Sequence, residues 1–419
     1  MVKVFDRVKD FSVARFLRLW PKECAYVFFK NGSPLSFIAK NKTVRHNREY
    51  SSTNAWNLNL SNGNFNNWNT KASDKNRVRA VSALFKYMIT TEDMIEAYYN
   101  CRASKRRTAS AIEYEMNYES RLIDLRNRIN SRTYSPGKSI CFIVTRPRYR
   151  EVFAASFEDR IIHHLIAIRL EPLFEQIFSD RTFNCRKGKG QMYGVEMLRR
   201  DIISCSNNFT EDCYILKLDL KGFFMSINKA MLAKLLDDFI VEYYKGDDIE
   251  DLRFLTNVVI LHCPEKNCER HSPIELWEFL ARNKSLFTNG EGLGVAIGNL
   301  FAQLFANFLL NKLDWFLILT LGFIFVGRYV DDFYIVDKDK DKLLAAIPKI
   351  RELLASLGLT LNPKKFYLQH YSKGVEFTGS VLKMRRVYVC KRTVYNFEQA
   401  VDRFNKSKSM KEVVSSILE

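Results

Sequence analysis

Two carboxylate-bearing strand patterns constrain the fold of this chain more than any other feature. The first, "CYILKLDLKGFFMSI", places Asp219 where an apolar strand gives way to a glycine turn. The second, "FIFVGRYVDDFYIVD", is two β-rich runs joined at Asp331 and Asp332, which predicts a tight hairpin with both acids at its tip. Asn-Gly or Asp-Gly is favoured in such a turn, and adjacent carboxylates repel each other. A local rule broken in this way indicates a functional site, most simply a bound cation.

The cation that suits such a site is Mg²⁺, which prefers a few convergent carboxylates together with substrate phosphates. Two such ions about 3.5–4 Å apart can activate a 3′-hydroxyl and stabilise a leaving pyrophosphate. We expect Asp219 and Asp331 to bridge the ions and Asp332 to be the third acid. The alternative is that these acids only solvate a hairpin tip.

Charge and composition narrow the class of partner. Lys and Arg outnumber Asp and Glu by 65 to 47, for a formal net charge of +18, which favours a polyanion such as nucleic acid. The longest apolar stretch, residues 315–326, is too short to span a bilayer, and the N-terminus lacks the apolar core of a signal peptide. Nine cysteines without a framework fit reduced thiols. We therefore expect a cytoplasmic protein without a membrane partner.

Composition also separates four regions. Residues 1–90 are polar and Asn-rich, and "NAWNLNLSNGNFNNWNTK" within them has the composition of a polar loop. Residues 91–206 are mostly helical, residues 207–385 alternate strands and helices, and residues 386–419 form a short basic stretch with helical periodicity.

Several motifs in the helical region have competing interpretations. The run "SICFIVTRPRYREVF" is strand-like, and an extended segment would place Arg146, Arg148 and Arg150 on one face, either as a charged edge strand or as a phosphate clamp. Ser156 and Asp159 are spaced as a capping box ahead of an amphipathic helix. Within that helix, "HH" is expected to pack rather than bind metal, and the basic "CRKGKG" loop suits either a phosphate contact or an ordinary turn.

Together these motifs resemble the reverse transcriptase family. "RYVDDF", with "LDLKGFF" upstream and "GLGVAIGNLFAQLFANFLLNKLD" between them, is similar to the palm of such an enzyme, and further blocks in the family's order extend the resemblance over residues 91–385. The resemblance implies an α+β right-hand polymerase: fingers over 91–206, a palm of antiparallel sheet backed by helices over 207–385 with a contribution to the fingers, and a short helical thumb over 386–419. It also implies two Mg²⁺ ions, with Mn²⁺ as the alternative.

The resemblance assigns roles to individual residues. Phe224 corresponds to the aromatic gate that excludes a ribose 2′-hydroxyl, so dNTPs are expected as substrates. Arg150 corresponds to the residue that grips the incoming triphosphate, and Tyr329 to the residue that braces the primer end. Lys365 corresponds to the lysine that protonates the departing pyrophosphate. The expected metal ligands are Asp219, Leu220, Asp331 and Asp332.

The block "IGNLFAQ" points to one class within this family. Ile297 precedes Gly298, and Gln303 stands where proline is usual, which resembles the reverse transcriptases of diversity-generating retroelements. Phe301 and Ala302 depart from the usual Thr and Ser of that class. An apolar Ile in the nucleotide pocket loses hydrogen bonds that would check the base, so we expect error-prone synthesis, chiefly at adenines.

The Asn-rich segment has a second interpretation in this light. Asparagine codons are rich in adenine, the base that these systems randomise, so residues 54–81 could be a translated image of a template repeat overlapping the reading frame. The alternatives are a genuine Asn-rich loop and a small binding module. The resemblance implies an RNA template, a cDNA primer, and a small basic accessory variability protein as partners.

Other functions share parts of this pattern. A retron-type, group II intron-type or abortive-infection reverse transcriptase is the nearest enzymatic alternative, and an inactive RNA-binding subunit is the non-enzymatic one. The segment "HCPEKNCERH", residues 262–271, invites a zinc interpretation, but its histidines lie too close to its cysteines for a usual finger. We expect a solvated insertion loop there.

Overall fold

The computed structural model describes residues 27–30, 33–36, 43–49, 54–59, 65–70, 89–103, 105–146 and 148–406. The chain divides into two units, one formed by Met1–Met88 with Lys245–Asp251 and the other by Ile89–Tyr244 with Leu252–Glu419. In the described part of the chain, no helix is long and apolar enough to cross a membrane.

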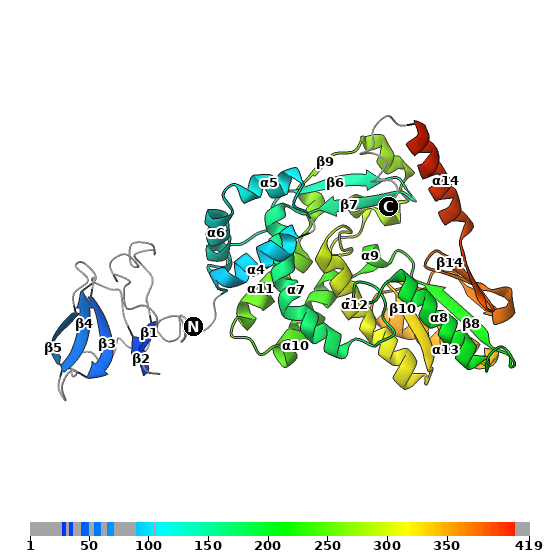
Figure 1. Ribbon diagram of the computed structural model, residues 1–419, viewed down its shortest axis with the longest axis horizontal. Helices are drawn as coiled ribbons and strands as arrows, with labels where there is room; N and C mark the ends of the chain where they lie inside the picture. The colour runs from blue at the N-terminus through cyan, green and yellow to red at the C-terminus, as the bar shows by residue number, and fades with distance from the viewer. Residues whose placement is uncertain are drawn as a thin grey trace. The chain divides into compact units, whose positions relative to one another are not determined.

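The first unit contains short antiparallel strands (Figure 1). One pair and one three-stranded sheet are described: β1 (Val27–Lys30) with β2 (Ser33–Ser36), and β3 (Thr43–Glu49), β4 (Asn54–Asn59) and β5 (Phe65–Thr70) in that order. The Asn-rich segment therefore holds strands β4 and β5, and the polar loop suggested by composition is wrong for those residues.

The second unit begins with helices and a short sheet. The helix α4 has a capping box in which Thr90 accepts from the amide of Asp93 and the Asp93 carboxylate accepts from the amide of Thr90. The sheet has the order β7–β6–β9, with β6 and β7 antiparallel and β9 parallel to β6. The elements are α4 (Thr91–Arg102), α5 (Ala109–Glu115), α6 (Tyr118–Asn130), β6 (Ser139–Val144), β7 (Arg150–Ala154) and β9 (Cys268–Arg270).

Two predictions on this region need correction. The run around the three arginines is a hairpin, because β6 ends at Val144 and β7 begins at Arg150. Arg146 and Arg148 therefore lie in the turn, and the three arginines do not share one strand face. The segment expected to be a solvated insertion loop instead adds β9 to the sheet by parallel pairing of Ser139 with Cys268.

Long helices connect this sheet with the strands that carry the acids. Ser156 caps α7 by accepting from the amide of Asp159, as the sequence predicts. The Asp159 carboxylate accepts from the Ser156 hydroxyl, Tyr134 and the amide of Gly137. The helices and turns are α7 (Phe157–Ile177), α8 (Gln191–Cys205), α9 (Phe223–Ser226), α10 (Lys229–Tyr243), α11 (Ile249–Leu261), η2 (Pro264–Lys266), η3 (Ile274–Phe279), η4 (Arg282–Lys284), η5 (Leu286–Thr288), α12 (Leu300–Trp315), η6 (Phe316–Thr320), α13 (Lys340–Ser356) and η7 (Tyr371–Lys373).

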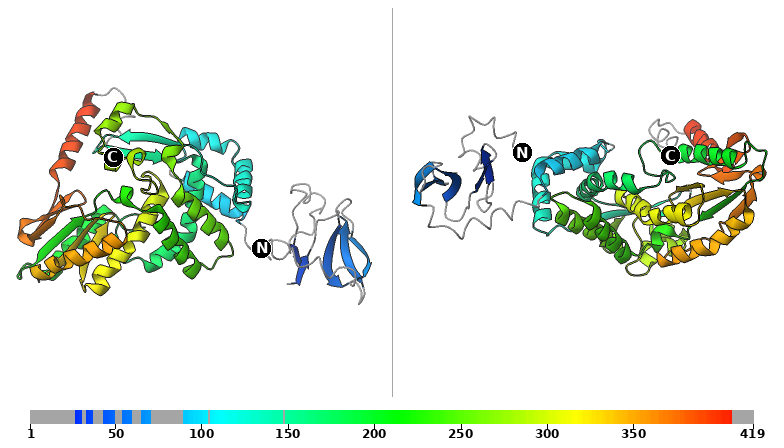
Figure 2. Two further views of the ribbon diagram at one scale, coloured as in Figure 1. Left: turned by 180° about the vertical axis from the view of Figure 1, so that it is seen from behind. Right: turned by 90° about the horizontal axis from the view of Figure 1, so that it is seen from below.

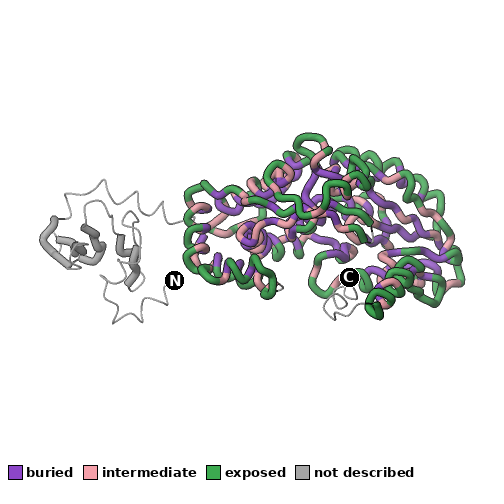
Figure 3. The backbone as a smooth tube through the Cα atoms, turned by 90° about the horizontal axis from the view of Figure 1, so that it is seen from above, coloured by how far each residue is buried: buried purple, intermediate pink, exposed green. Residues whose placement is uncertain are grey.

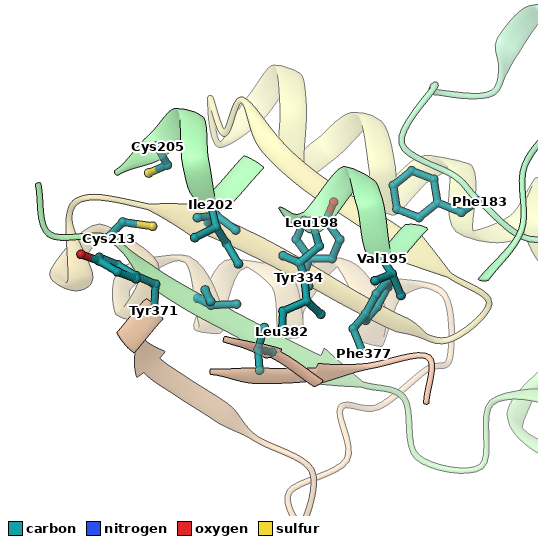
Figure 4. Close-up of a cluster of buried hydrophobic side chains, with 13 residues drawn as sticks. Phe183, Val195, Leu198, Ile202, Cys205, Cys213, Tyr334, Tyr371, Phe377 and Leu382 are labelled. Carbon is teal, nitrogen blue, oxygen red and sulfur yellow. The ribbon is translucent and has the colours of Figure 1, made fainter. Parts of the chain in front are cut away.

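A four-stranded antiparallel sheet carries the predicted acids. Its order is β10–β11–β8–β12, and we call it the central sheet. It packs against α8 and a second sheet, and Figure 4 shows Leu198 of α8 beside Tyr334 of β11. The neighbouring residues Phe333 and Ile335 are also buried, so both faces of β11 are covered. Its strands are β8 (Tyr214–Asp219), β10 (Phe325–Tyr329), β11 (Asp332–Asp337) and β12 (Tyr367–His370).

The chain ends in a small antiparallel sheet and one helix. The sheet has the order β13 (Val375–Phe377), β14 (Ser380–Lys383) and β15 (Arg386–Val389), and α14 (Lys391–Lys406) follows it (Figure 2, red). The expected palm–thumb boundary at residues 385/386 falls in the β14–β15 turn, and residues 407–419 of the expected thumb lie outside the described residues. Figure 3 shows the buried residues gathered inside the described unit. The α+β class with an antiparallel sheet and covering helices is confirmed.

Candidate active site

The central sheet brings the three predicted acids together where β8 ends and β11 begins. Asp219 is the last residue of β8, and it pairs in register with Asp332, the first residue of β11. Tyr329 pairs with Asp332 across the β10–β11 turn, which leaves Val330 and Asp331 as the turn residues. Val330 has a φ of 58°, a left-handed conformation that is costly for a β-branched residue. The predicted hairpin with both acids at its tip is confirmed.

The three carboxylates lie close enough together to affect one another's pKa values. Burial, followed by the negative charges of Asp219 and Asp332, raises the pKa of Asp331 to about 6. Burial and the charge of Asp219 also raise the pKa of Asp332. The Oδ1 atom of Asp332 is buried and has no hydrogen-bond partner among the described residues. The site therefore carries more negative charge than its protein neighbours neutralise.

Two lysines and an asparagine contact these acids. Lys365 Nζ lies 2.6 Å from Asp219 Oδ1, and Asn362 Nδ2 donates to Asp219 Oδ2 at 3.0 Å. Lys217 Nζ lies 3.8 Å from Asp332 Oδ2, at the outer limit of an ion pair. Both oxygens of Asp219 are thus engaged by the chain itself, whereas Asp331 and Asp332 are only partly compensated.

The donor set suits a hard divalent cation. Three carboxylates and the backbone carbonyl of Leu220, the residue after Asp219, supply the oxygen ligands that Mg²⁺ prefers. The unpartnered Oδ1 of Asp332 and the raised pKa of Asp331 fit a site that would bind a cation. No group of three His, Cys, Asp or Glu side chains is drawn together as a ready-made ion site in the described ranges. Since Lys365 and Asn362 hold Asp219, ion binding requires them to release it.

A buried polar network fixes the acidic turn from beneath. Arg328 is only 1% exposed, and its guanidinium donates to both carboxylate oxygens of Asp314 at 2.6 and 2.7 Å. It also donates to the carbonyl of Val330 at 3.0 Å, while the amide of Val330 donates to Asn184 Oδ1 at 3.0 Å. Asn307 joins the two halves by accepting from Arg328 and donating to the carbonyl of Asn184. These hydrogen bonds hold Val330 in its strained backbone conformation.

The acids form one wall of a large cavity. Its volume is about 1050 Å³, enough for a nucleotide and part of a nucleic-acid strand. Every residue predicted from the sequence for catalysis, substrate binding or metal binding lines it: Arg150, Asp219, Leu220, Phe224, Ile297, Gly298, Gln303, Tyr329, Asp331, Asp332 and Lys365. Residues separated by more than two hundred positions in the chain are thus brought to one surface.

Another part of the cavity lining comes from β7 and the segment before α12. The amide of Phe153 donates to the carbonyl of Ile297 at 2.9 Å. Gly298 follows with a φ of 115°, and a Cβ there would lie 2.6 Å from Val152 Cγ1. Only glycine allows this close approach. Gln303, one helical turn later, accepts from the thiol of Cys185.

Some cavity residues were missed by sequence analysis. Glu151 is 1% exposed and accepts hydrogen bonds from Trp277, Ser285 and the amide of Leu286. Asn362, three residues before Lys365 in "LNPKKF", donates to Asp219. Their partners lie at least 126 positions away in the chain, so no local pattern signals them.

Two motifs left open by the sequence have structural roles in the described chain. In the "CRKGKG" loop, Arg186 pairs with Glu175 and Lys189 pairs with Asp180, which favours the ordinary basic turn over a phosphate contact. His163 of the "HH" pair is buried against Phe301, and burial lowers its pKa to about 3. A neutral, packed histidine agrees with the prediction that it packs.

Comparison with known proteins gives a family and a set of distant structures. The sequence model described as "Reverse transcriptase (RNA-dependent DNA polymerase)" matches residues 145–382. No curated protein matches the chain. Apo telomerase from Candida tropicalis is similar to it, with 13% identity and a TM-score of 0.44 over 67% of this chain and 51% of the telomerase chain. Telomerase from Candida albicans in complex with a fragment of telomeric RNA has 13% identity and a TM-score of 0.41 over 61% and 46%. The chain spans about half the length of these telomerases.

Proposed function

The chain belongs to the reverse transcriptase (RNA-dependent DNA polymerase) family, and on that premise we propose that it copies an RNA template into cDNA from dNTPs. The observation that carries the proposal is the convergence of Asp219, Asp331 and Asp332 on a cavity that Arg150 and Lys365 also line. A merely structural hairpin would not place two mutually repelling acids beside a third at the wall of a cavity.

In this proposal Asp219, Asp331, Asp332 and the carbonyl of Leu220 hold two Mg²⁺ ions, with Mn²⁺ as the alternative. The bound ions supply Lewis-acid activation of the primer 3′-hydroxyl and stabilisation of the leaving pyrophosphate. Arg150, which also lines the cavity, orients the triphosphate by bidentate hydrogen bonds.

The remaining residues position substrates and move a proton. Lys365, which lies 2.6 Å from Asp219 in the protein alone, is the group that would protonate the departing pyrophosphate. In this proposal Phe224, which lines the cavity, is the ring that excludes a ribose 2′-hydroxyl, and Tyr329 braces the primer end. Ile297, Gly298 and Gln303 contact the nascent base pair.

Primer extension on an RNA template tests this proposal. Wild-type protein with dNTPs and Mg²⁺ should extend a DNA primer, and Asp331→Ala should lower the rate by at least about a thousandfold because it removes a bridging ligand. Asp341→Ala, at an exposed carboxylate on α13, is the matched control and should leave the rate unchanged. Extension by Asp331→Ala at the wild-type rate would refute the assignment, and an inactive wild-type chain that still binds RNA would favour the non-enzymatic alternative.

We further propose that the enzyme is of the diversity-generating class and misreads template adenines. The support is Ile297, whose apolar side chain lines the cavity and offers no hydrogen bond to a base. Sequencing cDNA made from a defined RNA should show errors concentrated at adenines, and Ile297→Gln should reduce them. Errors spread evenly over the four bases would contradict this class.

The class also suggests a partner and an origin for the N-terminal segment. We propose a small basic accessory variability protein that helps the short thumb to hold the duplex, testable by a salt titration of template binding with and without it. The proposed overlap of residues 54–81 with a template repeat predicts that a neighbouring gene differs from this segment only at adenines. A cytoplasmic location remains a prediction from the sequence.

A further inference from the structure

An exposed pair of stacked rings lies at the rim of the cavity. Tyr149, in the β6–β7 turn, and Phe279, at the end of η3, have ring centroids 5.4 Å apart and an interplanar angle of 24°. Their exposed fractions are 36% and 64%. Stacked rings usually gain their stability by burial, so a pair that stays exposed offers a flat apolar face to a ligand.

The pair is held on a fixed support. The buried Glu151 accepts from Trp277 Nε1 at 2.7 Å, from Ser285 Oγ at 2.6 Å and from the amide of Leu286 at 2.7 Å. These bonds fasten the segment that carries Phe279 to the strand that follows Tyr149. The guanidinium of Arg270 covers Phe287 at 4.0 Å and adds a further cross-link from β9. The two rings therefore form a built surface rather than a chance contact.

Unpaired positive charge surrounds the rings. Five exposed basic residues lie in the β6–β7 turn, at the start of β7 and in η4, and none forms an ion pair with another described residue: Arg146, Arg148, Arg150, Arg282 and Lys284. The acids on η3, the helix that carries Phe279, are Glu275 and Glu278, so the cations near the rings outnumber the anions. Elsewhere in the described chain most buried or half-buried arginines pair with carboxylates, as Arg181 does with Asp201. Free cations beside flat rings are the features of single-strand nucleic-acid binding.

The surface is continuous with the proposed active site. Arg148, Tyr149 and Lys284 line the cavity, and the carbonyl of Asn283 lies beside Gly222, three residues after Asp219. A strand that leaves the cavity past Arg150 meets Tyr149 first and Phe279 next.

We infer that Tyr149 and Phe279 form a stacking platform for unpaired bases of the template strand before those bases reach the acids. The platform rests on the proposed template-copying function. It takes any base, since every base has a π-face, and the flanking cations bind the intervening phosphates. A duplex presents no free base face there, so the platform discriminates single-stranded template from duplex.

Binding of labelled RNA–DNA duplexes tests this inference. Fluorescence anisotropy compares a primer–template carrying a 5′ template overhang of about six nucleotides with the same duplex ended bluntly. Tyr149→Ala and Phe279→Ala should each weaken binding of the overhang probe by about tenfold, as expected for loss of one stacked base, and leave the blunt probe unchanged. Phe279→Tyr, which keeps the ring, should retain wild-type affinity, and Tyr99→Ala, at an exposed ring on α4, is the matched control.

Abasic probes give an answer that does not depend on the folding of any variant. Wild-type protein should lose about tenfold in affinity when one particular overhang nucleotide lacks its base, and Phe279→Ala should be insensitive to that change. Equal binding of abasic and intact overhangs, or equal loss on overhang and blunt probes, would overturn the platform. Unchanged overhang affinity in both alanine variants would instead assign the rings to a protein partner.

Extension assays separate this result from the proposed function. A wild-type chain that binds overhangs through the platform but never extends a primer would refute polymerisation alone. A chain that extends primers with no dependence of binding on overhang bases would refute the platform alone.

Discussion

Asp331 occupies the second position of a two-residue turn and faces the carboxylate of Asp219 and that of its own neighbour. A residue in this position destabilises the folded chain unless a cation compensates it, because burial and two like charges oppose its ionisation. The raised pKa of about 6 expresses that cost directly. A difference of one between the folded and unfolded pKa corresponds to about 1.4 kcal/mol.

The sign of this shift predicts how stability depends on pH. Between its ordinary pKa of 3.8 and the raised value of about 6, Asp331 binds more proton in the folded than in the unfolded chain. Without divalent ions, the free energy of unfolding should therefore fall as pH rises through this window and stay low above it. Asp331→Asn should reduce that fall, to which Asp332 also contributes, and raise the stability at pH 7.5 by up to about 3 kcal/mol, measured by urea denaturation in EDTA.

Divalent ions should reverse the effect. Mg²⁺ should stabilise the wild-type chain at pH 7.5 and much less at pH 5, where protons compete for Asp331. Asp341→Asn, on the exposed first turn of α13, is the control and should follow the wild-type pH profile. A wild-type chain whose stability in EDTA is flat between pH 4 and 7 would contradict the proposed electrostatics.

Arg328 has the opposite character, since its charge is fully compensated. Replacing it by Met leaves Asp314 buried without its guanidinium and frees the carbonyl of Val330. We expect the free energy of unfolding to fall by about 3–5 kcal/mol, as when one partner of a buried pair is removed. In a double-mutant cycle with Asp314→Leu the losses should be far from additive. Arg200→Met, which breaks the surface pair with Glu196, should cost less than about 1 kcal/mol.

Phe224 gives a prediction about substrate choice. Its ring lines the cavity on the short helix α9, immediately after the glycine turn that follows Asp219. Phe224→Ala should raise kcat/KM for ribonucleotides relative to dNTPs by at least about tenfold, because the ring no longer excludes the 2′-hydroxyl. Steady-state primer extension with each nucleotide class measures this ratio, and Phe224→Tyr should keep the wild-type preference. An unchanged ratio in Phe224→Ala would remove Phe224 from this role.

At the scale of elements, the β6–β7 hairpin joins the cavity to the segment that carries η3 and η4. This connection depends on Glu151, which follows the exposed Arg150 on β7. The buried Glu151 carboxylate accepts three hydrogen bonds from that segment. Because adjacent strand residues point to opposite sides, the same strand can present Arg150 to a substrate and anchor its own support.

Glu151→Gln tests this connection. The amide keeps the shape of the side chain but replaces one acceptor oxygen with a donor, which should break at least one bond and weaken the others. We expect a loss of about 2–4 kcal/mol in stability of this region, a red-shifted Trp277 fluorescence, and faster proteolysis within residues 272–290. Glu269→Gln, at an exposed carboxylate on β9, should change none of these. Unchanged fluorescence in Glu151→Gln would show that the anchor lies elsewhere.

At the scale of the whole molecule, the formal charge of +18 predicts salt-sensitive binding of nucleic acid. Four basic side chains line the cavity without an ion pair in the described part of the chain: Arg148, Arg150, Lys284 and Arg392. If each contacts a phosphate, log affinity should fall with log salt concentration with a slope of about −3 or steeper.

A salt titration of template binding measures that slope. Arg392→Ala should make it shallower by about 0.7–0.9, the contribution of one phosphate. Arg200→Ala, at an exposed arginine already paired with Glu196, should leave the slope unchanged. Equal slopes for the wild type and Arg392→Ala would place the helix α14 outside the nucleic-acid contact.

Several features of the site follow from the sequence because they are local. A strand ending at Asp219 and a hairpin at Asp331 are predicted by apolar runs of strand length and by the turn between them. Ser156 caps α7 for the same reason. The prediction of one strand through Arg146–Arg150 is wrong, and Pro147 is a local signal against a continuous strand there.

Other features were decided only by the tertiary structure. Three contacts illustrate this: Lys365 pairs with Asp219, Glu151 anchors the segment of η3, and Arg328 is buried against Asp314. The chain contains many other acids and bases with similar sequence neighbours, so the local sequence does not identify these partners. The sequence by itself determined which short segments are strands and where acids end them, since backbone periodicity and turn chemistry act within a few residues. Which charges meet across the folded chain was decided by packing, because Coulomb and hydrogen-bond energies depend on distances in space and not on positions in the chain.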